Sequence, residues 1–339
     1  MRFRARIAII SLHTSPLDQP GAGDSGGMNV EIRAVADGLS ARGIAVDVFT
    51  RCSGKGVPEV ERLAPLARVI QVQSGPCAPV PKGELASLAE GFGEAVIAAA
   101  GDGYDLVHAH YWLSVPAARI VASHSGAPLV ASFHTLAEVK NRALSPGEAP
   151  ESLGRIAGER QAVRAADLMT IPTPAEASHL VELYGADPER LRVVPPGVDH
   201  DVFFPQDRAT ARARLSLGEG PVVLFLGRFE PIKGPDIAIR AFAEASRRGL
   251  DDATLVLVGG PSGAEGSRVD EALRDLAASE GISEAVTFVG ARPHRELPWI
   301  YSAGDVLMMP SRSEAFGLAA LEAQACGVPV VAADVGGLP

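Results

Sequence analysis

Short runs of β-branched and other apolar residues alternate with longer amphipathic segments along almost the whole chain. Because parallel strands need a crossover helix between them, this alternation predicts an α/β fold of doubly wound parallel sheets. The expected strands are residues 6–12, 45–50, 69–72, 106–109, 129–133, 168–172, 192–194, 222–227, 254–258, 286–289, 306–309 and 330–333. The expected helices are residues 29–42, 84–99, 151–165, 174–183, 235–248, 269–279 and 297–303. The strand runs are apolar almost throughout, which is typical of sheets covered on both faces.

The alternation breaks at Pro195, Pro196 and Gly197, and a polar segment follows at residues 206–220. We place the domain boundary there, with one Rossmann-like domain at residues 1–200 and a second at 201–339. Two such domains facing across a cleft would present loops and helix N-termini to a shared ligand. The chain stops in a loop at Pro339, just past a strand, so we expect the second domain to be incomplete.

The charge balance restricts the partners. The formal net charge is −10, which argues against a nucleic-acid backbone or an anionic membrane as the main partner. No stretch approaches 18 apolar residues, so no membrane span is expected. The three cysteines, Cys52, Cys77 and Cys326, have neither metal-type nor framework spacing, which fits a reducing cytosol better than disulfides. We therefore expect a cytoplasmic protein.

The glycine-rich segment at residues 21–27 contains a literal G-x-G-x-x-G, and Asp47 follows about twenty residues later. That combination spells a dinucleotide fingerprint. However, eight residues separate the first expected strand from Gly21, and Asp47 falls inside the second strand. A glycine loop whose N–H groups face an anionic or sugar ligand fits better, and a nicotinamide-dependent oxidoreductase remains the alternative.

Two cations, Arg228 and Lys233, lie in a loop between an expected strand and a helix. The planar fork of arginine and the point charge of lysine suit a diphosphate, although either residue could be an ordinary surface cation. Two carboxylates, Glu314 and Glu322, lie before and inside the last expected helix, at residues 317–326. At a helix start, they could bind sugar hydroxyls beside a phosphate or could simply be solvated.

Histidines end two expected strands, His108 and His110 on one and His134 just after another. No carboxylate cluster accompanies them in the sequence, so substrate contact or burial is favoured over metal. Asp199 and Asp201 resemble a metal pair but lie in the linker, where a turn is expected. Hydrolase-elbow and P-loop patterns are absent from the sequence.

Taken together, these residues resemble the GT-B retaining glycosyltransferases of family 4. Glu314 and Glu322 are similar to the E-x7-E motif of that family, and Arg228 with Lys233 to its diphosphate clamp. Further segments resemble the D-inositol 3-phosphate glycosyltransferases of mycothiol biosynthesis, namely residues 13–17, 19–21, 23–30, 110–114, 134–137, 139–141 and 182–188.

This resemblance implies transfer of N-acetylglucosamine, with retention, from UDP-N-acetylglucosamine to 1D-myo-inositol 3-phosphate. The residues implied at the donor are Gln19, Pro20, Gly27, Arg228, Lys233, Arg292, Glu314 and Glu322. Those implied at the acceptor are His13, Asp24, Ser25, Gly26, Gly27, Met28, Asn29, Lys82, Tyr111, Thr135 and Arg155. The implied catalytic residues are His134, Arg228, Lys233 and Glu314. No carboxylate nucleophile is evident for double displacement, so same-face attack is expected.

The resemblance implies no cofactor for the chemistry itself. It places a magnesium ion at Tyr301, Ser302, Gly304 and Val328, through backbone oxygens, and it allows a homodimer. The sequence departs from the family pattern at three positions. Glu31 stands where an aromatic residue is expected, and Ser302 and Gly304 stand where Arg and Ala are expected. Another family-4 transferase with a different acceptor, and an inactive remnant, remain alternatives.

Overall fold

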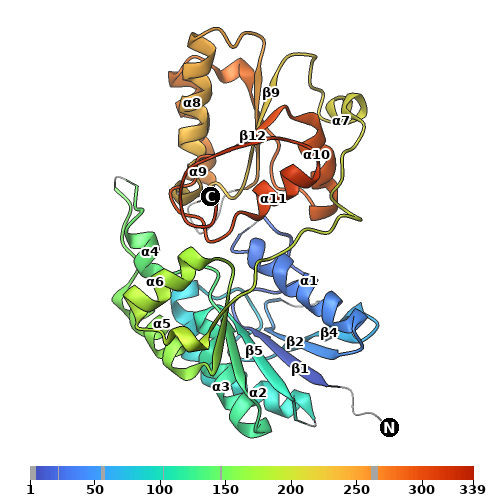
Figure 1. The fold of residues 1–339 in the computed structure, drawn as a ribbon, viewed down its shortest axis with the longest axis vertical. Coiled ribbons are helices and arrows are strands. Elements are labelled where there is room, and N and C mark those ends of the chain that lie inside the picture. Colours follow the sequence, from blue (N-terminus) through green and yellow to red (C-terminus); the bar gives the residue numbers. More distant parts are fainter. Residues whose placement is uncertain (1–4, 22, 55–57, 102, 146, 261–265) are drawn as a thin grey trace. The chain divides into compact units, whose positions relative to one another are not determined.

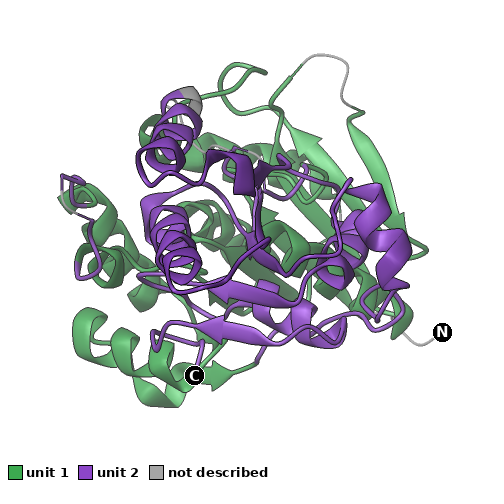
Figure 2. Cartoon of the chain, turned by 90° about the horizontal axis from the view of Figure 1, so that it is seen from above, with its two compact units in different colours: residues 1–18, 27–141, 151–194 green, residues 19–26, 142–150, 195–339 purple. Residues whose placement is uncertain are grey.

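The computed structural model describes residues 5–21, 23–54, 58–101, 103–145, 147–260 and 266–339, with the side chains of 266 and 267 left aside. The described chain forms two compact units, shown in separate colours in Figure 2. Unit 1 comprises residues 1–18, 27–141 and 151–194, and unit 2 comprises 19–26, 142–150 and 195–339. Residue 22, within the glycine-rich segment, lies outside the described residues.

Unit 1 is built on an eight-stranded sheet in the order β3-β4-β2-β1-β5-β6-β7-β8. Its strands are β1 (Arg6–Ser11), β2 (Ala45–Arg51), β3 (Val60–Ala64), β4 (Ala67–Val72), β5 (Leu106–His110), β6 (Leu129–Ser132), β7 (Leu168–Ile171) and β8 (Leu191–Val193). Every pairing is parallel except the one between β3 and β4. The fully parallel sheet expected from the sequence is therefore wrong at this edge, where a short hairpin adds an antiparallel strand.

Helices cover both faces of the unit 1 sheet (Figure 1). They are α1 (Gly27–Ala41), α2 (Ala89–Ala100), α3 (Val115–Ser125), α4 (Ala137–Asn141), α5 (Leu153–Ala165) and α6 (Pro174–Tyr184), with 3-10 turns η1 (Lys82–Leu88), η2 (Trp112–Ser114) and η3 (Pro188–Arg190). Ile9 packs with α1, whereas its neighbours Ala8 and Ile10 join the core beneath α2 and α3. Successive residues of a strand thus fill opposite cores, as the continuous apolar runs predict.

Unit 2 repeats this architecture on a smaller, fully parallel sheet in the order β11-β10-β9-β12-β13. Its strands are β9 (Val222–Leu226), β10 (Thr254–Val258), β11 (Val286–Phe288), β12 (Val306–Met309) and β13 (Val330–Ala332). Its helices are α7 (Arg208–Arg214), α8 (Pro235–Arg247), α9 (Gly266–Ser279), α10 (Leu297–Ala303) and α11 (Leu318–Ala325), with η4 (Pro231–Lys233), η5 (Ser283–Ala285) and η6 (His294–Glu296). The two Rossmann-like units confirm the predicted fold class.

Cys52 and Cys77 form a disulfide in unit 1, and Cys326 is free and buried. The expectation of unpaired cysteines is therefore wrong for two of the three. Cys52 follows β2 and Cys77 follows β4, and these strands are hydrogen-bonded neighbours. The spacing of the two cysteines in the sequence gave no sign of this proximity. They come together only because β2 and β4 pair in the folded sheet.

Candidate functional site

In unit 1, the strand order reverses between β1 and β5, because β2 flanks β1 on one side and β5 flanks it on the other. Ligands of doubly wound folds bind at such a switch point, beyond the carboxyl ends of the strands. The chain leaves β1 toward His13 and leaves β5 at Tyr111, whose backbone has a φ of 70°. The two rings lie with centroids 4.5 Å apart, so the switch point is lined by an aromatic pair.

Two cations approach the Tyr111 ring. Lys82 Nζ lies 5.0 Å and Arg155 Cζ 5.4 Å from its centroid, which is within cation–π range. Arg155 Nη2 also donates to Thr135 Oγ1 over 3.1 Å. Five of the residues assigned to the acceptor thus gather in unit 1, and they combine two positive charges with hydroxyls and aromatic rings.

Carboxylates on both sides hold Arg155 in place. Its Nε donates to Glu159 Oε1 at 2.8 Å, and its Nη1 lies 2.7 Å from Glu151 Oε1. Tyr184 donates from its hydroxyl to the other oxygen of Glu159. Burial works to lower the pKa of Arg155, but Tyr111, Glu159 and Glu151 together raise it above its usual value. Arg155 is therefore a fixed, permanently charged group.

The remaining acceptor assignments divide between the units. Asp24, Ser25 and Gly26 belong to unit 2, whereas Gly27, Met28 and Asn29 begin α1 in unit 1. Asn29 is buried, and its amide nitrogen donates to Thr14 Oγ1 at 2.8 Å and to the Ser15 carbonyl at 2.5 Å. Asn29 thus fastens the loop that carries His13.

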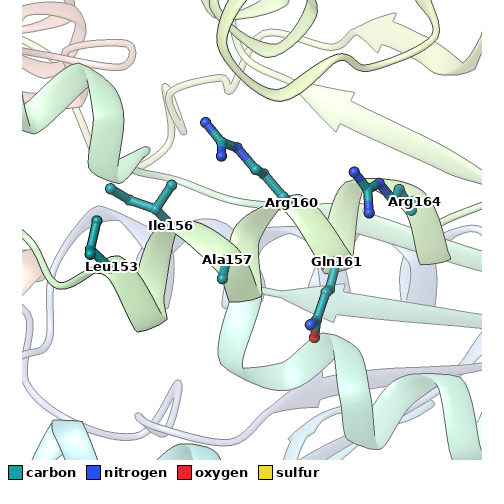
Figure 3. Close-up of a pocket in the computed structure, with 6 residues that line it drawn as sticks. All are labelled: Leu153, Ile156, Ala157, Arg160, Gln161 and Arg164. Atoms are coloured by element: carbon teal, nitrogen blue, oxygen red, sulfur yellow. The ribbon is translucent and has the colours of Figure 1, made fainter.

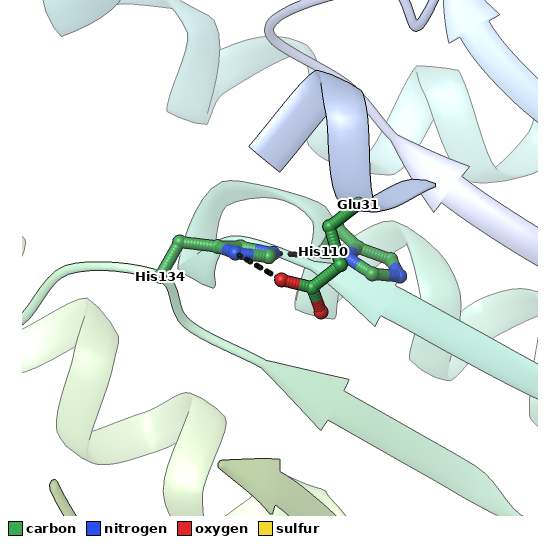
Figure 4. Close-up of side chains that lie close together, drawn as sticks. All are labelled: Glu31, His110 and His134. Carbon is green, nitrogen blue, oxygen red and sulfur yellow. Dashed lines mark hydrogen bonds and ion pairs between the residues drawn. The ribbon is translucent and has the colours of Figure 1, made fainter. Parts of the chain in front are cut away.

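Three side chains from separate elements form a polar cluster behind this switch point (Figure 4). His110 Nδ1 and His134 Nε2 lie 2.9 Å apart, and His134 Nδ1 lies 3.6 Å from Glu31 Oε2. The sequence shows no carboxylate cluster beside the histidines, but the fold brings one carboxylate, that of Glu31, next to them. The carboxylate comes from α1, at a position where an aromatic residue was expected.

Burial controls the charge state of this cluster. It lowers the pKa of His134 to about 3 with help from the charge of His108, and it lowers that of His110 well below its usual value. Burial also raises the pKa of Glu31 to about 7. His108, on the same face of β5, is hydrogen-bonded to Ser132 Oγ at 2.9 Å. Both clustered imidazoles are therefore neutral near pH 7.

A separate hollow lies on the outer side of α5 and is lined by Leu153, Ile156, Ala157, Arg160, Gln161 and Arg164 (Figure 3). None of the predicted site residues lines it. Because all six lining residues come from one helix and none belongs to the polar clusters at the strand ends, we do not assign it to the candidate site.

In unit 2, the strand order reverses between β9 and β12. Arg228 and Lys233 follow β9, and Glu314 follows β12, so all three lie at this switch point. Lys233 Nζ lies 2.6 Å from Glu314 Oε2, and Arg228 Nη1 lies 2.8 Å from Glu230 Oε1. The two cations predicted to hold the donor diphosphate are thus each paired with a carboxylate.

The Lys233 loop is rigid for identifiable reasons. Gly234 has a φ of 71°, and a Cβ there would lie 2.3 Å from the Pro310 carbonyl oxygen, so only glycine fits. Arg312 pairs with Asp236 at 2.7 Å and donates to the Pro231 carbonyl. These contacts fasten the loop after β9 to the loop after β12.

Glu314 is held from the far side by a glycine turn. The Gly337 N–H donates to the Glu314 carbonyl at 2.9 Å. A Cβ on Gly336 would lie 1.9 Å from that carbonyl oxygen, and one on Gly337 would lie 2.4 Å from the Ala315 carbonyl oxygen. The turn at 336–337 therefore fixes the course of the Glu314 loop.

Glu322 lies in α11, as predicted, and is buried with both oxygens engaged. His294 Nε2 lies 2.7 Å from Oε1, and the Tyr301 hydroxyl donates to Oε2 at 2.8 Å. Sequence reasoning missed His294, for which the sequence carries no signal. Arg292, two residues earlier, is exposed. A carboxylate oxygen can accept more than one hydrogen bond, so Glu322 retains capacity for a ligand hydroxyl.

The four residues assigned to magnesium offer a weak donor set. Tyr301 donates to Glu322, Ser302 Oγ accepts from the backbone N–H of Gln206 at 2.9 Å, and Gly304 and Val328 can supply only carbonyls. Magnesium sites in proteins are usually built around one or two carboxylates, and none of the four residues carries one. The magnesium assignment stays a prediction, and no step below depends on it.

The dinucleotide alternative fits poorly. Asp47 is buried in the middle of β2, where Arg6, Arg68 and Tyr104 all donate to it. It is therefore a structural acid rather than a ribose ligand at a strand end. The glycine run begins ten residues after β1 ends at Ser11, so its first glycine is not at the strand terminus that the fingerprint requires.

Comparison with known proteins agrees with this geometry. Residues 25–202 match the family model "Glycosyltransferase Family 4", and residues 207–339 match "Glycosyl transferases group 1". A D-inositol 3-phosphate glycosyltransferase from Acidothermus cellulolyticus is 50% identical over 98% of this chain and 76% of that protein. Its counterpart from Nocardia farcinica is 49% identical over 98% and 75%. The chain belongs to the D-inositol 3-phosphate glycosyltransferase family.

Solved structures agree on the GT-B fold of this family. Sucrose-phosphate synthase from Thermosynechococcus elongatus matches with a TM-score of 0.90 at 34% identity, covering 99% of this chain and 82% of that one. HepE of Anabaena, in complex with UDP and glucose, matches with a TM-score of 0.75 at 24% identity, covering 98% and 82%. The chain is thus a GT-B glycosyltransferase. Within the described residues, no helix is long and apolar enough to cross a membrane.

Proposed function

We propose that this glycosyltransferase moves N-acetylglucosamine from UDP-N-acetylglucosamine to 1D-myo-inositol 3-phosphate with retention, the first step of mycothiol biosynthesis. The choice of acceptor rests on one observation, the cluster at the unit 1 switch point that is formed by Lys82, Tyr111, Thr135 and Arg155. On a chain of net charge −10, two gathered cations with a hydroxyl make a favourable site for a phosphate monoester. The names of the 49–50% identical relatives support the same acceptor.

The donor would bind at the unit 2 switch point. Arg228 and Lys233 would hold its diphosphate, and Lys233 would exchange its partner Glu314 for phosphate oxygens. Glu314, once released, would accept hydrogen bonds from the sugar hydroxyls, and Glu322 would accept from the ribose. Gln19, Pro20 and Gly27 would border the donor. Arg292 would lie near the uracil.

The chemistry needs charge stabilisation more than a new nucleophile. When the bond from the anomeric carbon to the diphosphate breaks, negative charge grows on departing UDP, and fixed cations there lower the barrier. The acceptor hydroxyl would attack from the same face and pass its proton to the leaving phosphate. His134, neutral and held by His110 and Glu31, would shape the pocket at the anomeric carbon. The cytoplasmic location and a homodimer stay predictions.

The test is an acceptor comparison with the full chain. UDP release from UDP-N-acetylglucosamine would be measured with 1D-myo-inositol 3-phosphate, with myo-inositol, and with D-glucose 6-phosphate as a phosphorylated control. We expect release only with inositol 3-phosphate, and an α-linked product by NMR. Equal release with unphosphorylated inositol would refute the phosphate pocket, and release with glucose 6-phosphate alone would indicate another acceptor.

A further inference from the structure

Glu31, His110 and His134 converge from three separate elements of unit 1 (Figure 4). Glu31 lies on α1, His110 ends β5, and His134 follows β6. One ligand atom from each residue can be chosen so that all three lie within 4.8 Å of one another. Two imidazoles and one carboxylate in such proximity are a ligand set that binds zinc-like ions.

We propose that Glu31, His110 and His134 form a binding site for a divalent transition-metal ion of the zinc class. The proposal goes beyond sugar transfer and concerns an ion other than magnesium, because imidazole nitrogen suits zinc, cobalt and nickel, whereas magnesium prefers oxygen ligands. Three protein ligands leave a fourth tetrahedral position open to water or to a substrate oxygen.

The distances between the side chains suit such an ion. Bonds of about 2.0–2.1 Å to a tetrahedral zinc place neighbouring ligand atoms roughly 3.3 Å apart. His110 Nδ1 lies 2.9 Å from His134 Nε2, which is a separation between two possible ligand atoms. Glu31 Oε2 lies 3.6 Å from the other ring nitrogen of His134, Nδ1. With one ligand atom from each residue, all three atoms lie within 4.8 Å of one another. Small side-chain rotations would therefore bring one nitrogen of each ring and a carboxylate oxygen around one centre.

The protons can be accommodated without net charge on the rings. The hydrogen bond between His110 Nδ1 and His134 Nε2 requires one hydrogen between two nitrogens. That hydrogen must leave before both nitrogens can bind an ion. His110 Nε2 is buried and has no hydrogen-bond partner among the described residues. With His110 in the Nε2–H tautomer and His134 in the Nδ1–H tautomer, His110 Nδ1 and His134 Nε2 are both free to bind, and both rings remain neutral imidazoles, as ligation requires. The Nδ1–H of His134 then lies on the side of Glu31.

The surroundings hold the ligands in place. His110 is fully buried, and its ring lies 4.2 Å from the ring of His108 and 5.1 Å from that of His134, measured between centroids. His108 is in turn held by Ser132. Such second-layer contacts fix ring orientation and reduce the entropy lost when a metal binds.

The test is metal binding by the full chain without donor or acceptor, so its result does not depend on transferase activity. Co²⁺ would be titrated by visible absorption, and Zn²⁺ by calorimetry and by competition with Co²⁺. We expect one ion per chain and the intense absorption of tetrahedral Co²⁺. No saturable binding, or the weak spectrum of octahedral Co²⁺, would overturn the proposal.

Two variants test which residues bind the ion. Glu31→Gln keeps the shape and removes the anionic ligand, so affinity should fall at least tenfold. His124→Ala removes an exposed histidine on α3 and should leave affinity unchanged. Equal affinity in Glu31→Gln, or loss of binding in His124→Ala, would contradict the assignment. If Glu31→Gln fails to fold by circular dichroism, His134→Gln serves the same purpose.

A further readout rests on the proposed function. An ion bound to His134 would make that ring unavailable to the pocket at the anomeric carbon, so Zn²⁺ should inhibit transfer by the wild-type chain. The Glu31→Gln variant should need at least tenfold more Zn²⁺ for the same inhibition. Binding without inhibition would leave the metal site intact and count against the role of His134 in transfer.

Discussion

The two units place their candidate groups at the same topological position but hold charge differently. Arg155 in unit 1 is almost fully buried, with its guanidinium between Glu151 and Glu159. Lys233 in unit 2 is paired with the carboxylate of Glu314, and the side chains of Lys233 and Glu314 are 27% and 13% exposed. A group held between two carboxylates, one of them fully buried, is a fixed part of the fold. A group in a single, partly exposed ion pair can exchange its partner for a ligand, so we expect stability effects in unit 1 and turnover effects in unit 2.

The largest expected effect is on stability in unit 1. Arg155→Ala would leave the buried Glu159 without its cation, which costs about 3–5 kcal/mol when one member of a buried pair is removed. Urea unfolding measures this loss. Arg160→Ala, an exposed cation on the same helix, is the matched control and should cost under about 1 kcal/mol. Equal costs for the two variants would show that Arg155 is not a structural cation.

A buried carboxyl gives the next effect, which depends on pH. Burial, with the charges of Glu31 and Glu159, raises the pKa of Glu176 from 4.5 to about 8. The folded chain thus binds a proton that the unfolded chain releases above pH 4.5, so stability falls as pH rises from about 5 to 8. This loss is on the order of 3 kcal/mol.

Glu176→Gln should flatten that decline, as measured by denaturant unfolding at pH 5, 6.5 and 8. Glu182→Gln, which changes an exposed residue of the same helix, should keep the wild-type slope. An unchanged slope in Glu176→Gln would mean that Glu176 does not take up the proton.

In unit 2 the expected effect is on turnover. Lys233→Ala should lower kcat by on the order of 10², because a fixed charge at the leaving diphosphate is lost. Its stability should change by less than about 1 kcal/mol, since the ion pair is partly exposed. Arg240→Ala, an exposed cation on α8, should leave kcat unchanged. Near wild-type turnover in Lys233→Ala would remove Lys233 from the diphosphate site.

The smallest effect concerns Glu322. Tyr301→Phe would remove one hydrogen bond to a buried carboxylate, which costs about 1–3 kcal/mol of stability. UDP binding, titrated by calorimetry with and without Mg²⁺, should weaken by a similar factor in both series. If the substitution instead abolished only the Mg²⁺-dependent part of binding, the hydroxyl would belong to a magnesium site rather than to Glu322.

Much of the fold followed from the pattern of apolar runs, because both faces of each parallel strand are covered and the runs are long enough to see. Four of the described strands and helices did not follow from it. β3 is an exposed edge strand, and α3 contains many small residues. α4 has only five residues, and α7 is short and rich in arginine. Elements of this kind are defined by their neighbours rather than by their own periodicity.

The residue pattern alone drew attention to candidate site residues where they lie next to strand ends and helix starts, and the acceptor residues were named only through the family resemblance. Arg228, Lys233, Glu314 and Glu322 stood out because they flank strands and helix starts. The spacing of Glu151, Arg155 and Glu159 is a helical i,i+4 series and could have revealed the arginine clamp. Nothing local could place Glu31 beside His134 or His294 beside Glu322, because these contacts depend on how α1 and η6 pack. The roles of the site residues in catalysis and binding stay predictions.

The glycine turn at Gly336 and Gly337 has a consequence for mutational scanning. Neither residue carries a functional group, yet a methyl on either would overlap the backbone of the Glu314 loop. A scan scored by activity alone would rank both positions with the ligand-binding residues. Measuring ligand affinity and the yield of folded protein in parallel would separate these two glycines from the ligand-binding residues. Every substitution at a conformational position is harmful, whereas a binding position tolerates chemically similar side chains.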